Sequence, residues 1–425
     1  MNTHRHPPIR TLVLALAATL ASALPASSAP ASGPETQVWI DVATHNQAGM
    51  PDMGAMMGGM GGMAARMMGG GAAGTIGYPD ARHAMATGKF FDVAMLNSPA
   101  PGKEAEQQVP AGLGLGPSLP LLPPTTSRGR EEGGTTGIPD AEIHIKYYWG
   151  CGTAVRAGQP RELHMRAKDG KFEMSGDPMQ GRYAPDRGID PTPSYVLWPN
   201  PRTRNRAPAN ASLVGQHHIT GPGVPESLKF ELQQVADFMP KIALTQNGDL
   251  ASGLTLGWQP VDRAKAYFLH GLSLQDKTIV IWSSAEVPEA GQGLVNYLTG
   301  GQVDRWLKEK VLLPPSTTSC AIPKGIFADA SSGQASPGIL SMIAYGPETH
   351  VTWPPKPADP KQPWDPEWDV RIRTKSTAGA LLGMDLSGME GMDAGDAANP
   401  QPGQEPQKPE EGAAKKLLKG LLRNL

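Results

Sequence analysis

Three short segments near the middle of the chain alternate apolar and polar residues with the period of a β-strand. Residues 254–258 alternate leucine and tryptophan with small or polar residues, Tyr267 and Leu269 continue the alternation after a short turn, and a β-branched and aromatic run covers residues 278–282. Successive side chains of a strand point to opposite faces, so this pattern places the apolar residues on one buried face. It predicts three consecutive strands within residues 253–284.

Similar alternation occurs on both sides of these strands. Residues 141–149 place isoleucines on one face and His144, Lys146 and Tyr148 on the other. Further strands are predicted at residues 35–44, 89–96, 162–166, 171–174, 320–327 and 339–345. A run rich in proline and leucine at residues 114–124 lacks the backbone donors that the interior of a sheet requires. We expect it to lie extended along a surface with its leucines inward.

One segment shows helical spacing instead. In residues 302–311, Val303, Trp306 and Leu307 recur at intervals of three or four residues, and two prolines follow. The pattern predicts a short helix that covers one edge of a sheet.

The strands and the connecting stretches together predict a mostly β protein with two β-sandwich-like domains, a short helical excursion in the second domain, and long disordered or irregular segments. The predicted boundaries are a signal peptide at 1–23, with cleavage as late as residue 29; a first β domain at 35–180 interrupted by a Met/Gly-rich loop at 49–74; a Pro/Arg-rich linker at 181–212; a second β-sandwich domain at 213–353; a disordered Pro-rich and acidic tail at 354–411; and an amphipathic basic helix at 412–425.

Composition changes this picture in two ways. The 51 glycines and 43 prolines among 425 residues indicate that much of the length is connector, and the aromatic share of 6% concentrates the packed cores in a few segments. A formal net charge of −2 provides no electrostatic case for nucleic acid as a general partner.

The N-terminal residues predict export. Arg5 and Arg10 precede an apolar run at 11–20 that ends in small residues, which is the pattern of a secretory signal peptide. A membrane anchor is the alternative, although the run is short for a span. In an oxidising compartment the two cysteines, Cys151 and Cys320, are most simply one disulfide, and two separate buried thiols are the other reading.

The Met/Gly-rich loop allows two interpretations. Thioethers are soft ligands, so repeated methionines could bind Cu(I), as in the Met-rich segments of periplasmic copper-handling proteins, which this loop resembles superficially. The other interpretation is a low-complexity segment that makes adaptable apolar contacts with a membrane or a protein, because its filler is glycine and alanine rather than histidine. The candidate ligands are Met50, Met53, Met56, Met57, Met60 and Met63.

The C-terminal residues form an amphipathic pattern. Leucines recur on one helical stripe with lysines beside them, and the segment is too short to span a bilayer but long enough to lie on one. A helix that docks on a groove of the same protein is the alternative. The candidate membrane-binding or partner-binding residues are Leu417, Leu418, Leu421, Leu422, Lys415, Lys416 and Lys419.

Two resemblances follow from particular residues. The pattern Leu254-X-Leu256-X-Trp258-X-Pro260 followed by Tyr267 resembles strands B and C of a fibronectin type III or immunoglobulin-like sandwich, and the local match extends over residues 254–269. This resemblance implies a tryptophan packed between two sheets and a binding or spacing module. The segment Tyr-Trp-Gly-Cys-Gly at residues 148–152 is similar to uncharacterised exported proteins of Gram-negative bacteria.

The chain contains no nucleophile elbow, no Ser-X-X-Lys, no His-Glu-X-X-His and no phosphate-binding loop that ends in Lys-Ser/Thr. We therefore expect a non-enzymatic protein of the periplasm or cell envelope that binds a protein partner or a membrane surface. Two other functions remain open: Cu(I) binding through the Met-rich loop, and hydrolysis of envelope glycans by a carboxylate pair that needs no local motif. No cofactor other than copper is expected.

Overall fold

The computed structural model describes residues 33–48, 78, 81, 87–124, 141–168, 171–179, 181–184, 189, 191–203, 207–275, 277–328 and 336–383. Strands dominate these residues, so the prediction of a mostly β protein is confirmed. Within this part of the chain, no helix has both the length and the hydropathy needed to cross a membrane.

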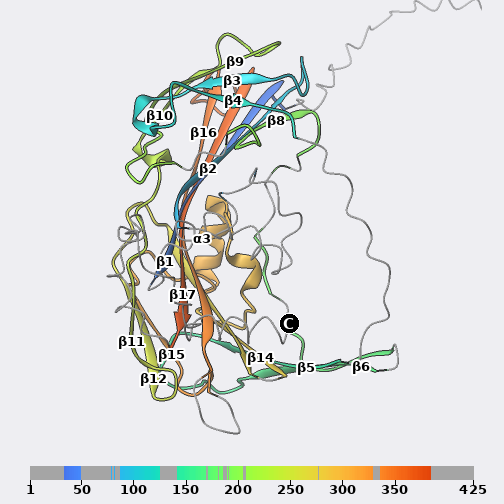
Figure 1. The fold of residues 1–425 in the computed structure, drawn as a ribbon, viewed down its shortest axis with the longest axis vertical. Helices are drawn as coiled ribbons and strands as arrows, with labels where there is room; N and C mark the ends of the chain where they lie inside the picture. Colours follow the sequence, from blue (N-terminus) through green and yellow to red (C-terminus); the bar gives the residue numbers. More distant parts are fainter. Residues whose placement is uncertain are drawn as a thin grey trace, which may run out of the picture. The chain divides into compact units, whose positions relative to one another are not determined.

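A single large sheet runs through the described residues (Figure 1). It contains, in spatial order, β7 (Lys171–Gly176), β6 (Arg161–Lys168), β5 (Ala141–Trp149), β14 (Thr278–Ser283), β13 (Ala266–Gln275), β16 (Gly338–Trp353), β17 (Trp368–Leu382), β1 (Thr36–Ala48), β2 (Gly88–Asn97) and β8 (Tyr195–Trp198). We call it the large sheet.

Two smaller sheets complete the described β-structure. The β9 sheet contains β10 (Lys229–Leu232), β9 (Gly215–Thr220), β3 (Ala105–Gln108) and β4 (Ser118–Leu121) in that order. The β12 sheet contains β11 (Leu244–Asp249), β12 (Gly253–Trp258) and β15 (Ser319–Ile322). Short 3₁₀ turns lie at η1 (Ala111–Leu113), η2 (Gln234–Ala236) and η3 (Gln292–Leu294).

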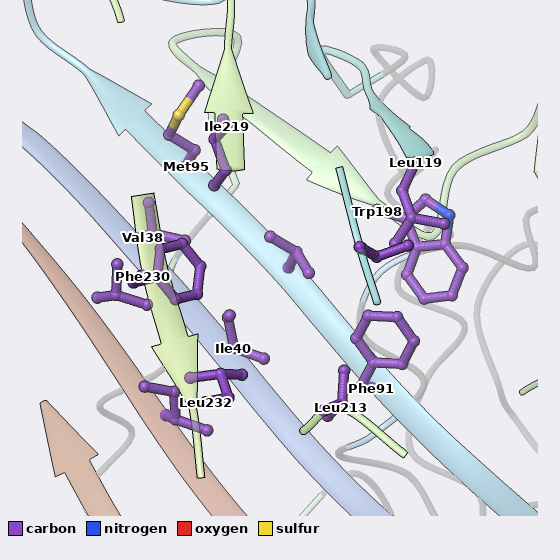
Figure 2. Packing of buried hydrophobic residues seen from close by; sticks show 14 of the residues in the cluster. Val38, Ile40, Phe91, Met95, Leu119, Trp198, Leu213, Ile219, Phe230 and Leu232 are labelled. Atoms are coloured by element: carbon purple, nitrogen blue, oxygen red, sulfur yellow. The ribbon is translucent and has the colours of Figure 1, made fainter. Parts of the chain in front are cut away.

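The first core lies between the β9 sheet and one end of the large sheet (Figure 2). Alternate residues of β1 and β2, such as Ile40 and Phe91, face Ile219 and Phe230 of the β9 sheet, and all four are almost fully buried. Leu119 of β4 belongs to the same cluster. The predicted inward leucines of the proline-rich run are thus found, and the run contributes an edge strand to the β9 sheet, where a proline is tolerated.

The second core lies between the β12 sheet and the other part of the large sheet. Leu256 and Trp258 of β12 pack in one cluster with Tyr267 of β13 and Leu382 of β17. The rings of Trp258 and Tyr267 meet edge to face with centroids 5.6 Å apart, a favourable geometry for aromatic pairs. The tryptophan therefore lies between two sheets, and the three strands predicted within residues 253–284 are confirmed as β12, β13 and β14.

The opposite face of the large sheet packs against the connection between β14 and β15. This connection contains α3 (Gly300–Lys308), the one α-helix of the described residues, in the predicted segment. Thr299 and Gln302 form a capping box at its start, so two backbone donors of the first turn are satisfied. Trp306 packs with Phe268 and Tyr345 of the large sheet.

The strand order differs from the predicted division into two sandwich domains. Strands from both predicted domains belong to the large sheet, in which β13, β14 and β16 of the second lie between two groups of strands of the first, and β5 of the first pairs in parallel with β14 of the second. The described residues between Pro34 and Gly383 belong to one compact unit. The two predicted domains therefore share the large sheet, because pairing is set by long-range contacts rather than by sequence order.

Residues 368–382 differ most from their predicted state. The sequence placed them in a disordered tail, whereas the structure places them in β17, between β16 and β1. β17 pairs in parallel with β1 over its register from Trp368 to Ala380. Charged side chains are usually exposed, so Arg371, Arg373 and Lys375 argue in the sequence against a buried strand. In the fold all three are buried.

Candidate functional site

A hollow with converging polar groups lies beside Phe238 of the first core and Met239 of the second. It has a volume of about 860 Å³ and is lined by parts of β1 and β2 and by loops at residues 207–212, 234–241 and 262–263. Thr44 of β1 donates a hydrogen bond of 2.6 Å to the carbonyl of Met239, which fixes the 234–241 loop to the sheet. We call this hollow the Lys89 pocket.

Lys89 forms part of the pocket wall. It stands near the start of β2, and its Nζ donates a hydrogen bond of 2.6 Å to the carbonyl of Ala211 and lies 5.2 Å from the ring centroid of Phe238. Burial lowers the pKa of Lys89, and the nearby Asp237 carboxylate opposes that shift. An ammonium has three N–H donors, so the bond to Ala211 leaves two for a ligand.

Asp237 organises the opposite loop. Its carboxylate is buried and accepts hydrogen bonds from the hydroxyl of Ser212 at 2.7 Å and from the backbone N–H of Leu213 at 2.8 Å. These bonds join the loops at residues 207–212 and 234–241 across the pocket. The Asp237 carboxylate therefore already has hydrogen-bond partners within the pocket wall.

Arg263 also lines the Lys89 pocket. Its Nη1 and Nη2 atoms donate to the carbonyls of Gln234, Asp237 and Phe238 at 2.6, 2.8 and 2.7 Å. Its backbone φ of 66° is uncommon outside glycine, and the three hydrogen bonds offset the cost of that conformation. Because Arg263 is engaged in this way, it acts as a brace for the pocket.

The rim of the pocket is exposed and has mixed polarity. Asn210 and Lys241 face solvent at the rim, and Val235 beside it is 43% exposed. The buried Phe238 and Met239 supply apolar surface beneath them. A concave, partly apolar site with a few converging polar groups and a lysine of shifted pKa has the properties of a binding pocket.

A buried ionic pair lies on the other face of the large sheet. Asp41 of β1 accepts hydrogen bonds from Nε and Nη2 of Arg373 at 2.7 and 2.6 Å, and both residues are buried. The ring centroid of Tyr297 lies 4.6 Å from the Arg373 guanidinium and 4.3 Å from the Nζ of Lys375. These contacts attach the segment before α3 to the sheet, and we interpret them as structural.

The predicted disulfide is confirmed. Cys151 follows β5 and Cys320 lies in β15, and the two sulfurs are bonded with the Cα atoms 5.0 Å apart. The bond joins the large sheet to the β12 sheet. The six candidate methionines of the Met-rich loop and the seven candidate residues of the C-terminal helix lie outside the described residues.

The adjacent histidines of β9 point to opposite faces, as strand geometry requires. His217 is buried, with its ring nitrogens 3.1 Å from Nε2 of Gln107 and 2.8 Å from the carbonyl of Leu213, so both nitrogens are satisfied within the fold. His218 lines a second hollow of about 790 Å³ on the outer face of the β9 sheet. The side chains of the described residues that converge as metal ligands lie elsewhere, on β5 and β6.

Sequence reasoning missed the Lys89 pocket. Its wall and braces come from residues 89, 212, 237 and 263, which are far apart in the chain and carry no shared motif. A lysine at the start of a strand is common, and no spacing marks it as special. The turn residues of the loops predict that loops occur at these positions, but they do not predict that the loops enclose a pocket. No protein-family model matches this chain, and no curated protein matches it either.

Proposed function

We propose that the protein is an exported, non-enzymatic binding protein of the cell envelope and that the Lys89 pocket binds a segment of a protein partner. The observation that carries the proposal is the half-buried Lys89 ammonium, which lies beside the ring of Phe238 in a hollow of about 860 Å³. Binding pockets combine apolar walls with a small number of placed polar groups in this manner.

Export is supported by the bond between Cys151 and Cys320. Disulfides persist in oxidising compartments, of which the bacterial periplasm is one, and are rare in the cytosol. The signal-peptide pattern at residues 1–23 points to the same destination. In this proposal the segment 412–425 attaches the protein to the envelope surface, as its amphipathic pattern suggests.

The ligand chemistry follows from the wall and the rim. Lys89 and Lys241 supply positive charge, whereas the charge of Asp237 is engaged by Ser212 and Leu213 and that of Asp262 by Nε of Arg263 at 3.0 Å. A negatively charged group that accepts hydrogen bonds would therefore be favoured over a positively charged donor. We expect a short extended segment that places an apolar side chain near Phe238 and a carboxylate near Lys89.

A peptide-binding measurement tests this proposal. The probes are a pool of short acetylated peptides with apolar side chains and a free C-terminal carboxylate, and the same pool amidated at the C-terminus. Lys89→Met should weaken binding of the free-acid pool by about tenfold or more, because a hydrogen bond to a charged group contributes about 1.5–3 kcal/mol. The amidated pool should bind weakly to both proteins.

Lys229→Met is the matched control, since Lys229 is an exposed lysine of the β9 sheet that lies outside the Lys89 pocket. It should bind the free-acid pool as the wild type does. Equal binding of the pool by wild type and Lys89→Met, or equal loss in both variants, would overturn the assignment of the pocket.

A further inference from the structure

Three metal-ligating side chains converge on neighbouring strands of the large sheet. Nε2 of His144 on β5 lies 3.0 Å from Oε2 of Glu162 on β6, and Nε2 of His164 lies 3.9 Å from the same oxygen. One ligating atom from each residue lies within 4.8 Å of the other two. None of the three residues lines the Lys89 pocket, so this feature is separate from the proposed binding site.

The strand register brings these residues together. β5 and β6 are antiparallel, His144 is directly opposite His164, and Glu162 is two residues before His164 on the same face. The two imidazole rings stack with centroids 4.0 Å apart and an interplanar angle of 12°. The two rings are held in place by the backbone pairing of β5 with β6, which runs from Ala141 opposite Ala167 to Tyr147 opposite Arg161. A site on paired strands is held more precisely than a site on a loop.

We propose that His144, Glu162 and His164 bind a divalent transition-metal ion of the class that prefers imidazole, Zn²⁺ or Cu²⁺. Ligand bonds of about 2.0–2.2 Å in a tetrahedral site separate neighbouring ligand atoms by about 3.3 Å. The two measured separations, 3.0 and 3.9 Å, lie on either side of that value. The side chains of His144, Glu162 and His164 are 21%, 41% and 50% exposed, so the two rings have room to rotate out of their stacked arrangement and direct both nitrogen lone pairs at one ion.

The ligand set selects the class of metal. Two imidazoles and one carboxylate suit zinc and copper(II), whereas calcium and magnesium prefer oxygen ligands and copper(I) prefers thiolates and thioethers. Three protein ligands leave at least one coordination position for water or an external ligand. A metal ion and an external ligand can reach the site from solvent, because the three side chains are partly exposed.

The charged groups at the site come from neighbouring positions of the two strands. The Glu162 carboxylate supplies the negative charge of the ligand set, which a divalent ion complements. Two cations flank it on this face: Lys146 stands opposite Glu162 in the register, and Arg166 lies two residues after His164.

A Zn²⁺ competition titration tests the proposal. The full mature chain, purified without a polyhistidine tag, is titrated with Zn²⁺ against a chromophoric chelator, and Cu²⁺ electron paramagnetic resonance then reports the number of nitrogen ligands. We expect one equivalent of Zn²⁺, two nitrogen ligands for Cu²⁺, and a rise in melting temperature with Zn²⁺, since a ligand of the folded state stabilises it. Zn²⁺ is used because the methionine thioethers of residues 50–63 are poor ligands for it.

His144→Gln and His164→Gln should each weaken Zn²⁺ binding by at least about tenfold and remove one nitrogen from the Cu²⁺ spectrum. His218→Gln, at a partly exposed histidine of the β9 sheet, is the matched control and should bind as the wild type does. Circular dichroism of each variant without metal establishes that it is folded. Zn²⁺ binding that is absent from the wild type, or unchanged in both β5 and β6 variants, would overturn the proposal.

Discussion

At the residue scale, two histidines are tuned in opposite directions by their surroundings. His350 of β16 shares hydrogen bonds of 2.9 and 3.1 Å with the carboxylate of Asp369 and lies 3.7 Å from Glu348. The bonds to Asp369 and Glu348 raise the pKa of His350 to about 9. Burial lowers the pKa of His270 to about 4, because its charged form would lose its hydration.

The first prediction concerns the stability of a His350→Gln variant. A histidine with a raised pKa stabilises the fold fully below its unfolded-state pKa of about 6.5, and this contribution is lost as the pH rises through about 9. The wild type should therefore exceed the variant in unfolding free energy below pH 6.5 and match it above about pH 9. Urea unfolding at a series of pH values measures the difference.

An NMR titration of His350 tests whether Asp369 causes its raised pKa. Asp369→Asn removes the carboxylate that makes the main hydrogen bond to His350 and should move the pKa of His350 down toward 6.5. A pKa that stays near 9 in Asp369→Asn would show that another group holds the proton. The contribution of His270 to the unfolding free energy has the opposite pH dependence. It is present above about pH 6.5 and is lost as the pH falls toward about 4.

At the element scale, β17 supports the arrangement of the large sheet. It forms a parallel ladder with β1 and an antiparallel ladder with β16. Its residues Trp368, Val370 and Ile372 belong to the first core, whereas Ala378, Ala380 and Leu382 belong to the second. A single strand therefore joins both cores, although it stands near the end of the described chain.

The second prediction compares two truncations. A chain that ends at residue 367 loses β17, the strand that joins β16 to β1 in the large sheet, and exposes both cores, so we expect it not to fold. A chain that ends at residue 383 keeps β17 and should fold as the full chain does. Urea unfolding and resistance to limited proteolysis distinguish them. Cooperative unfolding of the shorter chain at the same urea concentration would refute the role given to β17.

At the scale of the whole molecule, the disulfide connects distant parts of the chain. Cys151 and Cys320 are 169 positions apart, and their bond joins the end of β5 to the β12 sheet. A crosslink over that length removes conformational entropy from the unfolded chain worth about 5 kcal/mol. A protein with many glycine-rich and proline-rich connectors has a large unfolded-state entropy to be reduced in this way.

The third prediction is that the double variant Cys151→Ala and Cys320→Ala unfolds at lower urea than the oxidised wild type, with a loss of about 2–5 kcal/mol. Wild type treated with a reductant should match the variant, which separates the loss of the bond from the loss of the sulfur atoms. If the reduced and oxidised wild types unfold together, the disulfide has no stabilising role.

The sequence alone predicted local structure well, because strand alternation and helical spacing are properties of neighbouring positions. Residues 254–258 and 141–149 adopt the predicted strands, and the helix predicted at 302–311 is found at Gly300–Lys308. The pairing of the two cysteines was also accessible from the sequence, because an exported chain with two cysteines has one simple way to pair them.

Tertiary structure alone decided which strands are neighbours and which side chains meet. The parallel pairing of β1 with β17 brings together residues 332 positions apart, such as Asp41 and Arg373. The Lys89 pocket and the contact of His144 with His164 likewise depend on loop positions and strand register. No local pattern records these contacts, since the free energy that selects among pairings comes from burial across the whole fold.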